Sequence, residues 1–259
     1  MRNRFPCLVA GLIALLTLGL GPLAAQVTET PDTIAPGKFL LKMDALSLAF
    51  NRDHSGPDKF TALGLATTIL ATGVTQDVDV QVGMQFFARE SYQYQGQSTL
   101  HSGLGDVTLR TKWTYWRDDS LGAMAAVMPF VKVPTSTGGV GNDQVEGGLI
   151  FPWAMALGSG TVAGAMAEWD LLRNAANDGY DSRWSASGFL RQHLVGPWAA
   201  YAEATLGVSS DSTSSFVGAL GAGATWDLSE ALQLDYGVNR GLGYRTTDWA
   251  HALRVRWKF

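Results

Sequence analysis

Side-chain polarity alternates along most of this chain with a period of two residues. Between Val78 and Arg89, apolar side chains occupy the even-numbered positions and mostly polar ones the odd-numbered positions. Successive side chains of a β-strand point to opposite faces, so this alternation predicts strands with one apolar and one polar face. The pattern returns at residues 106–116, 144–157, 232–239 and 249–259.

A soluble β-sandwich would alternate in the same way, and three further features favour a membrane barrel. The predicted strands have about ten residues or more, against about five or six in soluble proteins, and ten tilted residues cross a bilayer. The polar faces carry charges in mid-strand, such as Asp79 and Lys112. Long polar connections such as Ser91–Ser102 alternate with short ones such as Gly158–Gly160.

Together these features predict an all-β fold, a transmembrane antiparallel up-and-down β-barrel of about 12 strands over residues 38–259. Closure removes the edges of the sheet and pairs its backbone groups within lipid. We therefore expect the protein in the outer membrane of a Gram-negative bacterium, surrounded by outer-membrane lipid. A net charge of -4 argues against a nucleic-acid partner, which normally requires a basic face.

Residues 1–25 have the features of a secretory signal peptide. Arg2 and Arg4 form a positive region, an apolar stretch runs from Leu8 to Leu20, and small residues precede Gln26. We expect cleavage after Ala25, with an uncleaved N-terminal anchor as the alternative, and a short periplasmic segment at residues 26–37. Cys7 is the single cysteine, which excludes a disulfide framework and a cysteine-rich zinc site.

The polar faces of the predicted strands indicate which residues line the lumen. An unpaired charge in a low-dielectric lumen costs several kcal/mol, so these side chains are expected to pair. Twelve strands enclose enough space for a narrow pore or a ligand cleft. The predicted lumen-lining residues are Lys42, Asp44, Asp79, Gln81, Arg89, Arg110, Lys112, Lys132, Glu146, Glu168, Asp170, Arg183, Arg191, Glu203, Asp235, Arg254 and Arg256.

The last alternating strand ends in Trp257-Lys258-Phe259. An aromatic residue at the final position resembles the C-terminal signature of bacterial outer-membrane barrels, which the barrel-assembly machinery reads. The resemblance implies that Trp257 and Phe259 form an assembly signal and that this machinery is a partner.

Two short motifs in the middle of the chain resemble a known family. Gly103-Leu-Gly-Asp106 opens a strand, and Phe130-Val-Lys-Val-Pro-Thr135 precedes the glycine-rich stretch Gly138–Gly141. This arrangement is similar to the MetA-pathway phenol-degradation family of outer-membrane barrels, whose members are often called transporters. The resemblance extends over about residues 35–259 and implies the uptake of aromatic compounds.

The sequence contains no phosphate-binding loop, no zinc-protease motif and no serine-hydrolase elbow, so we predict no catalytic residue, no metal site and no cofactor. The favoured function is passive passage of small, aromatic or hydrophobic solutes through the outer membrane. A plugged structural or adhesive barrel without transport is the main alternative. A lesser alternative is a lipid-acting hydrolase with His251 facing outward, for which Ser47 is a conceivable partner.

Overall fold

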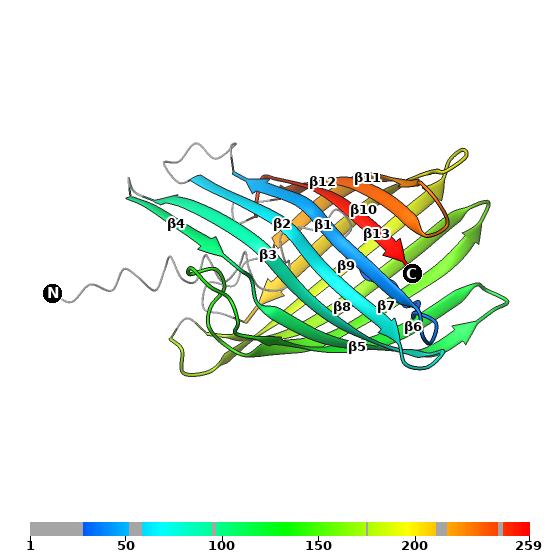
Figure 1. Cartoon of the computed structure of the whole chain (residues 1–259), viewed down its shortest axis with the longest axis horizontal. Coiled ribbons are helices and arrows are strands. Elements are labelled where there is room, and N and C mark those ends of the chain that lie inside the picture. Colours follow the sequence, from blue (N-terminus) through cyan, green and yellow to red (C-terminus); the bar gives the residue numbers. More distant parts are fainter. Residues whose placement is uncertain (1–27, 52–58, 95–96, 175, 211–216, 243–245) are drawn as a thin grey trace.

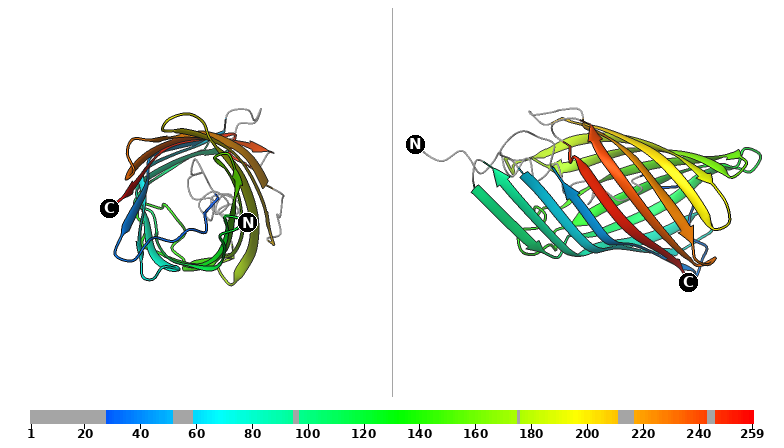
Figure 2. Two further views of the ribbon diagram at one scale, coloured as in Figure 1. Left: turned by 90° about the vertical axis from the view of Figure 1, so that its right-hand side faces the viewer. Right: turned by 90° about the horizontal axis from the view of Figure 1, so that it is seen from above.

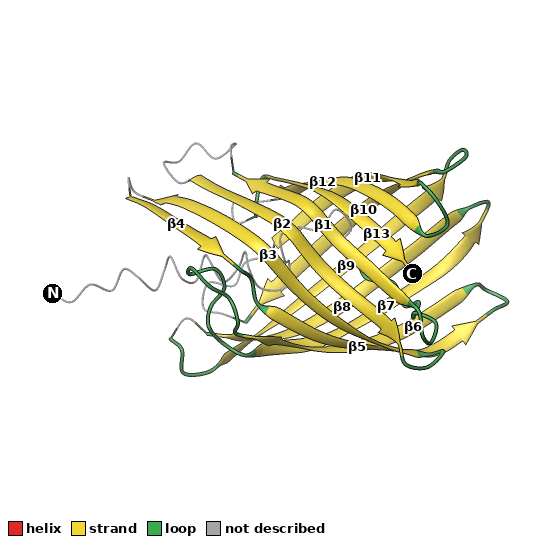
Figure 3. Ribbon diagram, in the orientation of Figure 1, coloured by secondary structure: helices red, strands yellow, loops and turns green. Residues whose placement is uncertain are grey.

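The computed structural model of the chain describes residues 28–51, 59–94, 97–174, 176–210, 217–242 and 246–259 (Figure 1). The predicted signal peptide lies outside the described residues. The regular elements are strands (Figure 3): β1 Phe39–Phe50, β2 Lys59–Gly73, β3 Val78–Tyr94, β4 Gln97–Gly103, β5 Val107–Asp118, β6 Ala123–Val133, β7 Glu146–Gly158, β8 Thr161–Arg173, β9 Tyr180–His193, β10 Trp198–Ser209, β11 Val217–Asp227, β12 Leu232–Leu242 and β13 Trp249–Lys258.

The strands form one antiparallel sheet that closes on itself (Figure 2). Each strand of the barrel pairs with its neighbours in the chain, and β13 pairs with β1 to complete the ring. β4 is additional, because it pairs only with the distal part of β3, and the remaining twelve strands make the barrel. The prediction of a twelve-stranded barrel is confirmed, although β4 lies in the stretch expected to be a loop.

The two ends of the barrel differ, as the alternating connection lengths predict. We call the end that carries the long connections, such as residues 134–145, the outer end, and the end with the short turns, such as Leu194–Pro197, the inner end. The β3–β4 hairpin projects from the outer end (Figure 1). Among the described residues there is no helix with the length and apolarity needed to span a bilayer.

The outer face of the barrel is apolar and carries aromatic pairs near its ends. Val80 and Leu109 are 40% and 47% exposed, although both are large apolar residues. Trp198 and Trp226 stack with ring centroids 5.2 Å apart near the inner end. Trp169 and Trp184 stack at 6.0 Å towards the outer end. Aromatic girdles at both membrane interfaces are typical of outer-membrane barrels.

The segment before β1 lies inside the barrel. The sequence predicts a periplasmic segment at residues 26–37, whereas its described part runs from a parallel bridge between Pro36 and Gly73 into the interior (Figure 2). Thr28 is buried there, as is Pro31. The physical reason is that charged side chains of the lumen wall bind it, as Lys42 Nζ does Glu29 Oε2 at 3.0 Å.

Candidate functional site

The lumen contains the predicted polar residues, with one exception. Ten of them are buried on the inner face: Asp44, Asp79, Gln81, Lys112, Glu146, Glu168, Asp170, Arg183, Glu203 and Asp235. The cations Lys42, Arg110, Lys132, Arg254 and Arg256 form ion pairs with acidic groups in the interior. Arg191 contacts Thr225 Oγ1 at 3.5 Å. The alternation of the sequence therefore assigns these faces correctly.

Arg89 is the exception, because the inner face shifts by one residue along part of the wall. A bulge in β1 lies between Asp44 and Leu46, opposite β13. At the same height, Ala66 has a positive φ of 52° and no register partner in β3. From there towards the outer end, the buried positions of β3 are Ala88, Glu90 and Tyr92, and Arg89 between the first two is exposed. A bulge exchanges the two faces of a strand, so the prediction that Arg89 lines the lumen is wrong.

Three cations of the wall surround one carboxylate of the N-terminal segment. The Glu29 carboxylate lies 3.0 Å from Lys42 Nζ, 3.4 Å from Arg110 Nη1 and 4.0 Å from Lys112 Nζ. Burial by itself would raise the pKa of Glu29, but these neighbouring cations outweigh burial and hold the pKa well below its usual value. The Glu29 carboxylate is therefore charged at neutral pH.

Further hydrogen bonds join the same segment to three strands of the wall, β3, β5 and β10. Thr28 N donates to Glu203 Oε1 at 2.7 Å. Lys112 Nζ donates to the carbonyl of Thr30 at 2.7 Å and to that of Asp32 at 3.1 Å. Ile34 N donates to Asp79 Oδ2 at 3.2 Å. The segment is thus anchored along its described length, and it fills part of the lumen cross-section.

Acidic and basic side chains also pair across the wall itself. Arg254 Nε donates to Asp44 Oδ1 at 2.7 Å, and Arg254 Nη1 lies 3.8 Å from Asp235 Oδ2. Arg183 Nε donates to Asp170 Oδ2 at 2.9 Å. These contacts match the expectation that lumen charges pair. Among the described residues, the lumen wall carries both signs side by side, unlike the single-sign ring of charged side chains in some selective ion pores.

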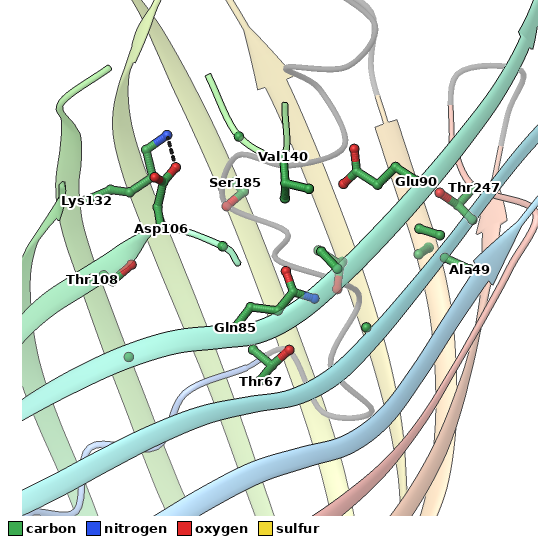
Figure 4. Close-up of a pocket in the computed structure, with 18 of the residues that line it drawn as sticks. Ala49, Thr67, Gln85, Glu90, Asp106, Thr108, Lys132, Val140, Ser185 and Thr247 are labelled. Carbon is green, nitrogen blue, oxygen red and sulfur yellow. Dashed lines mark ion pairs between the residues drawn. The ribbon is translucent and has the colours of Figure 1, made fainter. Parts of the chain in front are cut away.

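A cavity of about 250 Å³ occupies the outer half of the lumen (Figure 4). Apolar side chains such as Ala49 and Phe60, both buried, contribute to its lining, together with polar groups such as Gln85. Arg110 both lines the cavity and contacts Glu29, so the N-terminal segment lies directly beneath it. The arrangement can hold a small molecule with an apolar body and a few hydrogen-bonding groups.

The two sequence motifs meet at this cavity. Asp106 Oδ2 lies 3.2 Å from Lys132 Nζ, and the same lysine lies 2.9 Å from Glu146 Oε2. Lys132 and Glu146 are predicted lumen residues, and Asp106 reaches Lys132 because the consecutive strands β5 and β6 pair antiparallel, with Val107 opposite Val133. Sequence reasoning missed Glu29, because a single acidic residue in a short segment forms no pattern.

Among the described residues, the partner of the outward-facing His251 is a tyrosine and not a serine. Its Nδ1 lies 2.9 Å from the hydroxyl of Tyr236. Ser47 is buried on the inner face, and the β1 residue that pairs with His251 is Leu48. The His251–Ser47 pair of the hydrolase alternative is therefore wrong. Within the described part of the chain, no group of three or more His, Cys, Asp or Glu side chains could hold a metal ion.

Comparison with known proteins places this barrel among outer-membrane structures. A family model described as "Putative MetA-pathway of phenol degradation" matches residues 24–259. No curated protein matches the chain. An outer membrane channel from Pseudomonas putida F1 is 13% identical with a TM-score of 0.67, and the alignment covers 88% of this chain and 98% of the channel.

Two further solved structures show the same architecture. The NanC porin is 10% identical with a TM-score of 0.50, covering 83% of this chain and 99% of the porin. The translocator domain of the autotransporter NalP from Neisseria meningitidis is 11% identical with a TM-score of 0.54, covering 88% of this chain and 90% of that domain. These similarities establish an outer-membrane barrel fold. Because the three structures comprise a channel, a porin and a translocator domain, the fold alone does not identify the function.

Proposed function

This chain belongs to the family described as "Putative MetA-pathway of phenol degradation", and on that premise we propose that it is an outer-membrane channel for passive passage of small solutes with an aromatic or hydrophobic body. The match of the family model confirms the resemblance to this family that the motifs at residues 103–141 indicate. The solute class is our inference from the cavity.

The observation that carries the proposal is the lining of the cavity. Its walls combine apolar side chains, among them Phe60 and Val217, with threonines and one amide. The charged lining residues are of both signs, Glu90 and Asp106 against Arg110, Lys132 and Arg183. An apolar surface with a few polar groups favours a weakly charged organic solute over a bulk ion.

Transport by purified protein in liposomes tests the proposal. Entry of a polyhydroxybenzene is compared with entry of an aromatic sulfonate of similar size, and protein-free liposomes supply the rate through lipid alone. Protein-dependent entry of the first solute and little entry of the second supports the channel. Equal entry of both would contradict the solute class.

A plugged structural barrel is the second candidate, and a specific observation favours it. The N-terminal segment occupies the lumen beneath the cavity and contacts several strands through Thr28, Glu29 and Ile34. In this case neither solute enters faster than through lipid, and the protein shows negligible single-channel conductance in planar bilayers.

A further inference from the structure

The connection between β6 and β7, residues 134–145, folds back towards the lumen. Its backbone joins the stretch that precedes β5: Thr137 N donates to the carbonyl of Leu104 at 3.0 Å, and Leu104 N donates to Thr137 Oγ1 at 2.9 Å. Val107 N donates to Thr135 Oγ1 at 2.8 Å. We call residues 134–145 the inward loop. These reciprocal hydrogen bonds give it one defined position against the wall.

Asp106 holds the start of the inward loop. Its Oδ1 accepts hydrogen bonds from the backbone N–H groups of Thr135 and Ser136, both at 2.9 Å. Its other oxygen faces Lys132 Nζ at 3.2 Å, and Lys132 also donates to Asn142 Oδ1 near the end of the loop. Asp106 and Lys132 therefore tie both ends of the loop to the barrel through charge-assisted bonds.

Glycine is required where the inward loop touches its neighbours. Gly138 and Gly139 have φ angles of +65° and +78°, a region that glycine enters without strain. A Cβ on Gly138 would collide with the carbonyl oxygen of Ser102, and one on Gly139 would collide with the His101 ring. The close approach explains the glycine-rich stretch of the sequence, and it determines where the next residue points.

That next residue is Val140, which projects into the cavity. Its side chain is only 4% exposed, although it belongs to a surface connection. Figure 4 shows it amid the other lining residues, including Gln85 and Ser185, with the Asp106–Lys132 ion pair beside it. An apolar side chain carried into the lumen by a loop reduces the free cross-section at that height.

We propose that Val140 determines the size of solute that passes the outer half of the lumen, and that Asp106 and Lys132 are positioning residues for it. The proposal rests on the proposed channel function. Its physical basis is steric. Because the inward loop is hydrogen-bonded to the wall at both ends, displacing it costs free energy, and the volume of the side chain at position 140 therefore determines the free cross-section of the lumen there.

Liposome swelling with uncharged sugars of increasing size, arabinose, glucose and sucrose, tests the proposal. Val140→Ala is expected to raise the swelling rate several-fold for the largest sugar that enters through the wild-type protein, and Val140→Phe to lower it. Val145→Ala is the matched control, because Val145 lies in the same loop and is exposed on the outside. It should leave the size limit unchanged.

The positioning role has its own test. Asp106→Ala should raise the size limit in the same direction as Val140→Ala, and combining the two changes should add little, because both act through one side chain. Asp119→Ala, in an exposed turn at the inner end, is the control. Heat-modifiable gel mobility verifies that each variant is assembled, and Val140→Ala still decides the question if Asp106→Ala does not assemble.

The outcomes separate the two proposals. A size limit that is the same in Val140→Ala, Val140→Phe and Val145→Ala, with sugars entering all of them, overturns the role of Val140 and leaves the channel intact. Absence of sugar entry through every variant, together with absence of the aromatic solute, overturns both. Entry of the larger sugar only in Val140→Ala supports the inference.

Discussion

The contact of Glu29 with three cations makes docking of the N-terminal segment testable by one substitution. Glu29→Gln keeps the size of the side chain and removes its charge. Lys42, Arg110 and Lys112 then face one another in the lumen without this anion, and the Glu29 side chain is only 13% exposed. We expect the segment to leave its docked position more often.

The magnitude follows from the burial of the pair. Removing one partner of a buried ion pair costs about 3–5 kcal/mol. Since 1.4 kcal/mol is a factor of ten, the ratio of docked to undocked segment should fall by roughly 100- to 4000-fold. The contacts of Thr28 with Glu203 and of Lys112 with the Thr30 carbonyl remain, so docking is weakened and not abolished.

A cysteine reporter measures the effect. Cys7, within the predicted signal peptide, is the single cysteine of the chain, so Thr30→Cys provides a unique thiol in the expected mature protein. Its reaction with a bulky maleimide should accelerate in the Glu29→Gln background, and single-channel conductance should rise. Glu230→Gln removes an exposed carboxylate from an inner-end turn and serves as the control.

Two results would refute this reasoning. Labelling and conductance that are equal in Glu29→Gln and Glu230→Gln would show that the ion pairs do not hold the segment. Failure of Lys42→Met to restore part of the docking in the Glu29→Gln background would show that uncompensated positive charge is not the cause, because this second change removes one of the three cations.

The remaining predictions concern pH, facing and assembly. The pKa of Glu29 lies below its usual 4.5, so the contribution of Glu29 to docking is complete above about pH 4.5 and is lost only as the pH falls through the lower pKa of the folded protein. Single-channel conductance should therefore be the same at about pH 7 and about pH 5. A rise in conductance at pH 5 would contradict the ion-pair geometry. Val80→Arg places a charge on the lipid face at a cost of about 2–4 kcal/mol, whereas the arginine of Gln81→Arg faces the lumen. The assembled fraction on heat-modifiable gels should fall for Val80→Arg only. An equal fall in both variants would show that the two faces are wrongly assigned. Deleting Phe259, which stacks on Phe39 at 5.5 Å, should reduce assembly while export continues, as measured by membrane and periplasmic fractionation.

The facing of most wall residues follows from the sequence, because the period of two is a local property of an extended chain. Asp79 and Gln81 alternate with Val80, and no distant contact is needed to place them on opposite faces. The closed barrel follows indirectly from the same pattern, because strands within lipid can pair all of their backbone N–H and C=O groups only when the sheet closes.

Arg89 marks the limit of that local rule. The bulge between Asp44 and Leu46 is defined only relative to β13, which comes more than two hundred residues later in the chain. Its continuation at Ala66 transfers the shift to β3 and turns Ala88 and Glu90 inward. A register shift arises between strands, so the polarity pattern of one strand cannot reveal it.

The sequence by itself determined the strands, their apolar and polar faces, the closed barrel and the charged lumen, because each depends on neighbouring residues and on the solvent on either side of a sheet. The tertiary structure alone decided what occupies that lumen. Glu29 meets Lys42 and Arg110, and Val140 enters the cavity, only after the barrel has closed around them. Such contacts join short irregular segments to distant strands, and segments without periodicity carry no signal of where they will dock.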